Sequence, residues 1–341
     1  MLNLARSIKY KTLAMPIKPS ASQSLPPLSV GNVVSTGLVL YRSHLKSYLS
    51  ISLRATLWVI LPTLVAIPLT ALIPSFIVGS RLNFTWWLIL LWILLLSFGW
   101  AKYLANSALI SRLAFSELID RPETVSNARN YIQPRMWSFL SVALNVGFLL
   151  FLVFVLLYFL MGVGAIIIVS VISGVVLPSL TNNPIGSVIA SILIVIMVLA
   201  GLFGFFFGFI WFFSRWIIAE VPLAVEEDIN VAVKEKISVK QSIDRSWELT
   251  KNSVFRIQLV VLVAFLVTLP LIAVTSYIPQ IFLLGAQPGS TLYWTIYGIS
   301  ILTSSGSQIF VLPFWQVIKA VIYYDLRSRK EGLGLQLRDS I

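Results

Sequence analysis

The stretch RWIIAEVPLAVEEDINVAVKEKISVKQSIDRSWELTKNSVFR, residues 215–256, is the longest polar interval after residue 136. It holds seven of the 25 Lys and Arg residues and seven of the 13 Asp and Glu residues. The flanking residues 138–214 and 257–318 contain no Asp, Glu, Lys or Arg. Uncharged segments of this length are typical of membrane-spanning helices, so the polar stretch between them must lie at one face of a bilayer.

The composition of the whole chain also excludes a soluble domain. Its mean hydropathy is +0.91, with 58% hydrophobic and 11% charged residues. A net charge of +12 could indicate nucleic-acid binding, but the basic residues stand beside the apolar segments, as the positive-inside bias predicts. We therefore expect no nucleic-acid partner, and anionic lipid headgroups as the counter-charge.

The residue types needed for most reaction centres are scarce. The chain has no Cys and a single His, His44, which excludes thiolate chemistry and a His-based metal site within one chain. Glu226, Glu227 and Asp228 are adjacent in a polar stretch and are expected to be solvated. No nucleotide-binding, serine-hydrolase or zinc-protease motif occurs in a suitable setting. We expect no catalytic residue, no metal and no cofactor.

Length and charge predict six spanning helices with both termini in the cytoplasm. The uncharged residues 137–180 would form a helix of about 66 Å, twice the thickness of a bilayer, so a break is expected near Gly162 and Gly164. Either two spans lie here, or one span precedes a segment that is re-entrant or lies on the outer surface. One span at 137–160, with 161–183 as that segment, places 24 of the 25 Lys and Arg on one side of the membrane. The expected spans are 51–78, 84–110, 137–160, 185–214, 257–278 and 291–318.

Residues 238–251 predict an amphipathic helix at the inner membrane surface. Ser238 and Gln241 match a capping box at its start. An apolar stripe follows at helical spacing, and Trp247 is expected at headgroup depth. The stripe is formed by Val239, Ile243, Trp247, Thr250 and Val254.

A weak internal repeat predicts three similar units. Ser29-Val30 aligns with Ser238-Val239, and a looser third copy begins at Thr124-Val125. Each copy runs into a hydrophobic hairpin. The expected fold is therefore an all-α polytopic membrane protein with six transmembrane helices in three hairpins, each preceded by a cytoplasmic interfacial amphipathic helix. The predicted organisation is a basic flexible tail (1–28), a single membrane domain (29–337) with units at about 29–110, 124–214 and 238–324, and a C-terminal cytoplasmic tail (325–341).

Three phrases carry a family resemblance: WIIAEVPLAVEED (216–228), SIDRSWELTKNSVFRI (242–257) and VIYYDLRSRKEG (321–332). Together they resemble the bacterial membrane proteins grouped with the membrane domain of glycerophosphoryl diester phosphodiesterase, and related six-span families. The resemblance implies a six-span fold in the bacterial inner membrane. It implies no reaction. The phosphodiesterase activity belongs to a separate soluble barrel domain, and nothing in this chain can supply such a domain. The matching residues are Pro222, Glu226, Arg245, Ser246, Trp247, Leu249, Thr250, Lys251, Tyr323, Tyr324, Asp325, Leu326, Arg327, Arg329, Glu331 and Gly332.

Candidate site residues fall into two sets. Polar residues in the middle of the last span predict either close helix packing or a broken helix that lines a substrate path. Residues at the inner surface predict structural or lipid-facing roles. The first set is Ser304, Ser307 and Gln308; the second is Glu226, Arg245, Trp247, Lys251, Asp325, Arg327 and Arg329.

Asp325 is the first acid after a 76-residue interval that contains none, at the point where the last span ends. A carboxylate at this depth is costly without a cation. Arg329 is the local partner at i+4. Arg245, on the amphipathic helix, is the alternative partner, and its pairing with Asp325 would hold that helix against the last span.

Three functions are compatible with these features. The first is a non-enzymatic membrane protein that binds or organises lipid or partner proteins at the cytoplasmic leaflet. The second is a transporter, or transporter subunit, for a lipid or a small apolar solute. The third, a lipid-modifying enzyme, would need a cytoplasmic pocket that encloses Glu226 and Arg245.

Overall fold

A computed structural model of the chain describes residues 29–78, 82–171, 184–226 and 237–332. Within these residues the protein consists of helices joined by short turns, without β-strands. Six described helical segments are long and apolar enough to cross a membrane, so the chain is an all-α, multi-pass membrane protein. The elements are α1 (Val30–Ser43), α2 (Leu45–Val78), α3 (Leu82–Leu118), α4 (Val125–Ile132), η1 (Gln133–Arg135), α5 (Met136–Val171), α7 (Pro184–Trp216), α8 (Glu220–Val225), α9 (Val239–Thr250), α10 (Val254–Ile272), the π-helix η4 (Ala273–Tyr277), α11 (Ile278–Leu284) and α12 (Thr291–Glu331).

The three short helices α1, α4 and α9 begin in the same way. Each is preceded by an extended Ser or Thr whose hydroxyl accepts the backbone N–H three residues later. These capping residues are Ser29, Thr124 and Ser238, the positions that the repeat alignment placed together. At α9 the predicted capping box is confirmed, because Gln241 also accepts the backbone N–H of Ser238. The starts of the three units therefore share one local structure.

Each short helix packs mainly on the hairpin of the preceding unit. Helix α4 lies against α3, and α9 lies against α5, α7 and α8. Helix α1 closes the cycle by packing against α12 and α10 of the last unit. Gly37 permits this crossing, because a Cβ there would stand 2.5 Å from Ile318 Cδ1. The three units are thus joined in a ring by their short helices.

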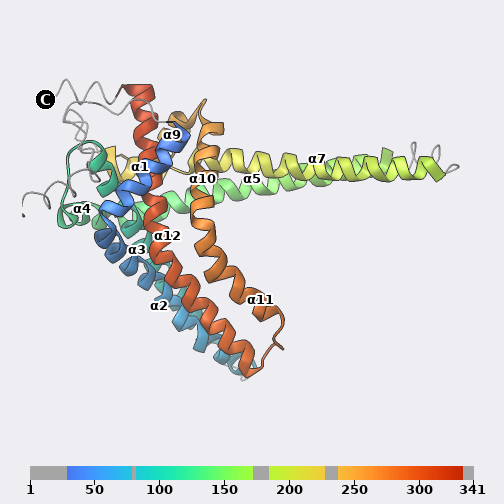
Figure 1. The fold of residues 1–341 in the computed structure, drawn as a ribbon. Coiled ribbons are helices and arrows are strands. Elements are labelled where there is room, and N and C mark those ends of the chain that lie inside the picture. Colours follow the sequence, from blue (N-terminus) through green and yellow to red (C-terminus); the bar gives the residue numbers. More distant parts are fainter. Residues whose placement is uncertain (1–28, 79–81, 172–183, 227–236, 333–341) are drawn as a thin grey trace, which may run out of the picture.

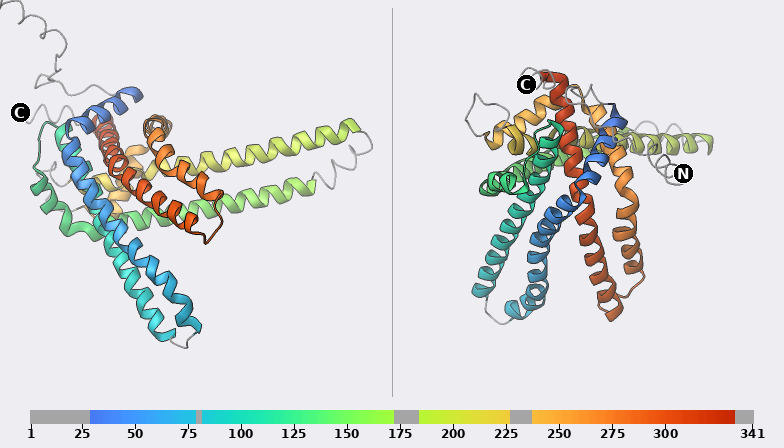
Figure 2. Two further views of the ribbon diagram at one scale, coloured as in Figure 1. Left: turned by 60° about the horizontal axis from the view of Figure 1, so that its bottom comes forward. Right: turned by 60° about the vertical axis from the view of Figure 1, so that its left-hand side comes forward.

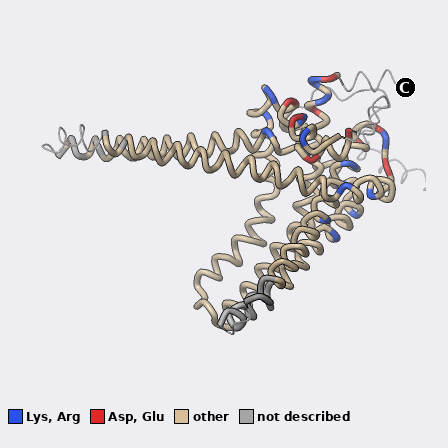
Figure 3. The backbone as a smooth tube through the Cα atoms, turned by 180° about the vertical axis from the view of Figure 1, so that it is seen from behind, with Lys and Arg blue, Asp and Glu red and all other residues tan. Residues whose placement is uncertain are grey.

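The three hairpins diverge from a common end. The α5–α7 hairpin extends away from the other two, which Figures 1 and 2 show from three directions. Lys, Arg, Asp and Glu gather where the hairpins meet, and the described residues of the arms beyond are uncharged (Figure 3). We call this region the charged end; it contains α1, α4, α8, α9 and the last turns of α12. Most of the buried core lies here or in the adjoining turns of the spans.

Helix α12 is the central element of the charged end. Its C-terminal half is buried, from Val311 to Arg327 with few exceptions, and contacts α1, α3, α9 and α10. A buried polar network joins it to α3, since Ser111 donates to Gln316 Oε1 at 2.7 Å and Gln316 Nε2 donates to Ser107. A fully hydrogen-bonded network of this kind specifies how two helices align.

The predicted break near Gly162 and Gly164 is wrong. Helix α5 runs without interruption from Met136 to Val171, so 161–171 continues the helix. Each Gly weakens a helix interior by only about 1 kcal/mol, less than the cost of leaving a backbone group without a hydrogen bond in a bilayer. The remainder of the predicted outer segment, 172–183, lies outside the described residues.

The predicted boundary of the C-terminal tail is also wrong. Helix α12 continues through Asp325 to Glu331 and ends at Gly332, whose φ of 63° suits a left-handed C-terminal cap. Asp325 and Arg327 are buried instead of belonging to a tail. The predicted tail at 1–28 lies outside the described residues.

Candidate functional site

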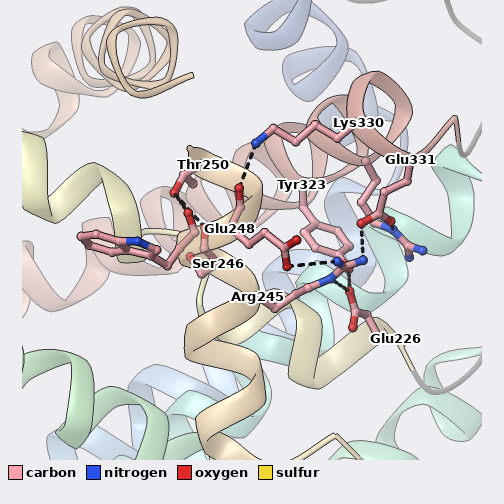
Figure 4. Close-up of polar contacts among 10 residues, drawn as sticks. Glu226, Arg245, Ser246, Glu248, Thr250, Tyr323, Lys330 and Glu331 are labelled. Atoms are coloured by element: carbon pink, nitrogen blue, oxygen red, sulfur yellow. Dashed lines mark hydrogen bonds and ion pairs between the residues drawn. The ribbon is translucent and has the colours of Figure 1, made fainter. Parts of the chain in front are cut away.

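The polar contacts at the charged end centre on Arg245. We call Glu226, Arg245, Tyr323 and Glu331 the Arg245 cluster; it joins α8, α9 and α12 (Figure 4). Arg245 Nε donates to Glu226 Oε1 at 2.8 Å, and its Nη2 pairs with Glu331. The hydroxyl of Tyr323 donates to the same oxygen of Glu226. One arginine therefore connects the acids of two separate elements.

Glu226 is the buried member of this cluster. It is the C-terminal cap residue of α8 and only 8% exposed, so the expectation that it is solvated is wrong. Its carboxylate is satisfied by the guanidinium of Arg245 and the hydroxyl of Tyr323, which offset the desolvation that burial entails. Sequence position alone could not show that α9 and α12 cover the end of α8.

The acids beside Arg245 favour its charged form. Burial by itself would lower the pKa of its guanidinium, but the hydrogen bond and charge of Glu226 and the charge of Glu331 raise that pKa above its ordinary value. The cluster therefore does not present a proton-transfer group through Arg245.

Asp325 does not pair with Arg245, the long-range partner that was considered for it. It pairs with Arg329 at 3.2 Å, which confirms the local i+4 pair. Its closest cation is Arg256 of α10, whose Nη1 lies 2.6 Å from Asp325 Oδ2. The predicted pair between Asp325 and Arg245 is wrong, because Arg245 lies at the other acids, Glu226 and Glu331. Helix α9 is still held against α12, but through Glu331.

Lys330 closes the C-terminal end of α9. Its Nζ donates to the carbonyl oxygens of Glu248 at 2.8 Å and Lys251 at 2.7 Å (Figure 4 shows the first). The Glu248 carbonyl also accepts the backbone N–H of Lys251 at 3.2 Å, and a cation at this end of the helix suits the helix dipole. The side chain of Lys251 is exposed. Arg327 is buried, donates to Glu331 at 2.9 Å, and lies over the ring of Tyr323.

The most buried face of α9 carries hydroxyl groups. Ser242 donates to the carbonyl oxygen of Ala219 at 2.6 Å, and Ser246 donates to that of Arg215 at 2.7 Å. Thr250 also reaches the Arg215 carbonyl, at 3.3 Å. The Arg215 carbonyl lies in the last turn of α7, where helical partners run out, and Ala219 is the residue that precedes α8. Small hydroxylated residues therefore let α9 lie close to the end of α7.

Trp247 contacts a neighbouring helix. Its ring lies 5.4 Å from that of Trp216, and the guanidinium of Arg215 lies 4.5 Å above it. Trp211 forms a further edge contact with it at 6.1 Å. A cation over an indole and packed aromatic rings are both stabilising, so Trp247 helps to hold α9 on α7.

The polar residues inside the last span lie in an unbroken helix, so the broken-helix alternative is wrong. Ser304 and Ser307 donate to carbonyls of their own helix, and the carbonyl of Gln308 accepts from Ser52 of α2 at 3.4 Å. Thr303 donates to the carbonyl of Thr275 at 2.9 Å. Thr275 lies in the π-helix that follows Pro270, where helical hydrogen bonding is irregular. These residues serve helix contacts.

The contacts of the Arg245 cluster hold α8, α9 and α12 together. Its acids are bound by cations and a hydroxyl, and no group of three His, Cys, Asp or Glu residues in the described part of the chain could hold a metal ion. A cavity of about 340 Å³ lies nearby between α3, α4 and the end of α8. Neither Glu226 nor Arg245 lines it.

No protein-family model, curated protein or solved structure matches this chain. The resemblance to the six-span membrane families therefore stays a prediction that rests on the quoted motifs.

Several residues of the site were not singled out as candidates. Glu331 and Tyr323 stand in the YYDLRSRKEG motif, so that motif was the available signal for them. Lys330 stands in it too, but its role depends on where α9 ends. Arg256 had no signal beyond its charge, since nothing local pairs it with a residue 69 positions away.

Proposed function

We propose that this chain is a non-enzymatic membrane protein whose charged end binds anionic lipid headgroups at the cytoplasmic leaflet and organises lipid or partner proteins there. Both termini would be cytoplasmic, and the resemblance of its motifs favours the bacterial inner membrane.

One observation carries the proposal: the acids and the cations of the charged end differ in exposure. Glu226 and Asp325 are buried in ion pairs. Several cations of the described chain are instead exposed. Since the described acids largely serve the fold, the outer surface of the charged end is left with a positive excess, which suits an anionic membrane face. Among the described residues the exposed cations are Arg42, Lys46, Arg54, Arg121, Lys240, Lys251, Arg329 and Lys330, against three exposed acids, Asp120, Asp244 and Glu248.

The exposure and pairing of each cation indicate whether it should bind lipid. Arg245 and Arg256 pair with acids of the protein, so they are assigned to the fold. Lys251 belongs to the exposed set, together with residues of α1 and of the first turns of α2. The alternative of a transporter is less favoured, because α12 is continuous and its polar residues bond to helix backbone.

The test neutralises exposed cations only. In the variant Arg42→Gln, Lys46→Gln, Lys240→Gln and Lys251→Gln, each lost charge removes about 1 kcal/mol of attraction to anionic lipid. We expect the variant to retain several-fold less anionic phospholipid after purification, measured by mass spectrometry against zwitterionic lipid.

The matched control exchanges the same residues for the other cation: Arg42→Lys, Lys46→Arg, Lys240→Arg and Lys251→Arg. It should retain as much anionic lipid as the unaltered protein. Equal retention of anionic lipid by the neutral and the exchanged variants would contradict the proposed function.

A further inference from the structure

The 340 Å³ cavity at the charged end is separate from the Arg245 cluster. We call it the α4 cavity; it opens between the last turns of α3, the turn before α4, the first turn of α4 and the end of α8. Its volume corresponds to about ten water molecules, enough for a small polar group. Its lining residues are Arg112, Phe115, Ser116, Ile119, Arg121, Pro122, Glu123, Thr124, Asn127 and Val225.

One cation of the cavity is held rigidly in place. Arg112 is only 5% exposed, and its Nε donates to Glu123 at 2.8 Å. Its Nη1 donates to the carbonyl oxygen of Ala224 at 2.8 Å, and its guanidinium lies 3.9 Å from the centre of the Tyr131 ring. A guanidinium held by an acid, a carbonyl and an aromatic ring keeps one orientation, which favours binding over a mobile side chain.

Two of the described lining residues are cationic and one is acidic. Arg121, which is exposed, adds a second guanidinium to that of Arg112, and the acid, Glu123, is paired with Arg112. Ser116, Thr124 and Asn127 add hydroxyl and amide groups. Guanidinium groups with neutral polar neighbours are the usual protein environment of a phosphate group.

The remaining wall of the cavity is apolar. Phe115, Ile119 and Val225 contribute it, so the cavity offers a charged side and a hydrophobic side. A bare inorganic anion uses only the first of these, whereas a phosphate ester with carbon atoms attached uses both.

We propose that the α4 cavity binds a phosphate group that carries a small organic substituent, of which the headgroup of a phospholipid is one source and a soluble phosphate ester the other. The lipid source rests on the proposed function, while the cavity itself does not. Bound ligand would stabilise the charged end, since Phe115 of the cavity wall also lies 5.5 Å from Tyr323 of the Arg245 cluster.

The experiment measures ligand-induced stabilisation of the full chain in detergent. Its melting temperature is followed with short-chain phosphatidylglycerol below its micelle concentration, with glycerol 3-phosphate, and with sodium sulfate at equal ionic strength. We expect a concentration-dependent rise with at least one of the two phosphate esters. No rise with either phosphate ester, or an equal rise with sulfate, overturns the proposal.

Two variants keep the test specific to the cavity. Asn127→Trp fills the cavity without changing charge, and Asn130→Trp places the same side chain at an exposed position of α4 outside the lining. We expect the first to weaken binding at least about tenfold and the second to leave it unchanged. Arg121→Gln should weaken binding of glycerol 3-phosphate about tenfold through the loss of a charge-assisted hydrogen bond. Equal binding by Asn127→Trp and the unaltered protein overturns the proposal.

The outcomes separate the cavity from the function. Binding of glycerol 3-phosphate but not of the lipid, abolished by Asn127→Trp, supports the cavity site with a soluble ligand. Loss of cavity binding while anionic lipid retention still depends on the exposed cations leaves the proposed function standing without this site.

Discussion

Two acids that pair with Arg245 differ sharply in exposure. Glu226 and Glu248 both carry a carboxylate directed at Arg245, at 2.8 Å and 3.7 Å. Glu226 is 8% exposed and Glu248 is 73% exposed. An ion pair in water contributes little, whereas removing one member of a buried pair leaves the other uncompensated.

The same substitution should therefore have different effects at the two sites. Glu226→Gln should lower the free energy of unfolding by about 2–3 kcal/mol, since Arg245 and Tyr323 lose a charged partner but Arg245 retains Glu331. Glu248→Gln should change it by less than about 0.5 kcal/mol. Unfolding of the detergent-solubilised protein by titration with a denaturing detergent measures both. Equal effects would show that Glu226 is not the main partner of Arg245.

Helices α2 and α3 meet closely where Gly99 of α3 faces the turn of α2 that contains Pro62. Pro62 has no N–H, so it donates no helical hydrogen bond to the carbonyl of Trp58, four residues earlier in α2. Gly99 of α3 lies against that carbonyl, and a Cβ at Gly99 would stand 2.5 Å from the Trp58 oxygen. The indole of Trp92 donates to the carbonyl of Pro62 at 3.0 Å. The close α2–α3 contact thus depends on one glycine and one proline.

Gly99→Ala should destabilise the protein by about 1–3 kcal/mol, because the clash is with rigid backbone and the two helices must separate. The matched control is Gly147→Ala in α5, where a Cβ would meet nothing within 4 Å. This control should be neutral or stabilising by up to about 1 kcal/mol, through helix propensity. Thermal unfolding of the two variants in the same detergent gives the comparison. A neutral Gly99→Ala variant would mean that α2 and α3 are farther apart than described.

The whole molecule joins three hairpins at a single charged end. Short helices α1, α4 and α9 each lie on the hairpin of the preceding unit, so no unit completes its own packing. The arms expose long apolar surfaces, which a bilayer would cover. Figure 3 shows that the charge distribution separates the charged end from all three arms.

This asymmetry predicts the topology. Reporter fusions after residues 20, 120, 235 and 340 should report the cytoplasm, and fusions near 182 and 286 the external side, because Lys and Arg are retained on the cytoplasmic side. Paired cytoplasmic and periplasmic reporters at each site measure the orientation. A cytoplasmic signal at 182 together with an external signal at 235 would contradict the six-span arrangement.

Local sequence determined a large part of this structure. Uncharged segments identified six spans, since in a bilayer the backbone must satisfy its own hydrogen bonds. The capping box at Ser238 located the start of α9, because a cap depends on residues within one turn, and the repeat aligned Ser29 and Thr124 with it. Asp325 and Arg329 were also paired correctly, since their i+4 spacing is a property of the helix itself.

Only the tertiary structure decided which distant residues meet. Asp325 took Arg256 as its second partner, and Arg245 took Glu226 and Glu331, because the crossing of α9, α10 and α12 sets those distances. The burial of Glu226 and the α4 cavity likewise depend on how α8 lies between its neighbours. Composition and periodicity determine which face of a helix is apolar and where the helix begins. They do not contain the angles at which helices cross, and it is those angles that bring the charged groups of this protein together.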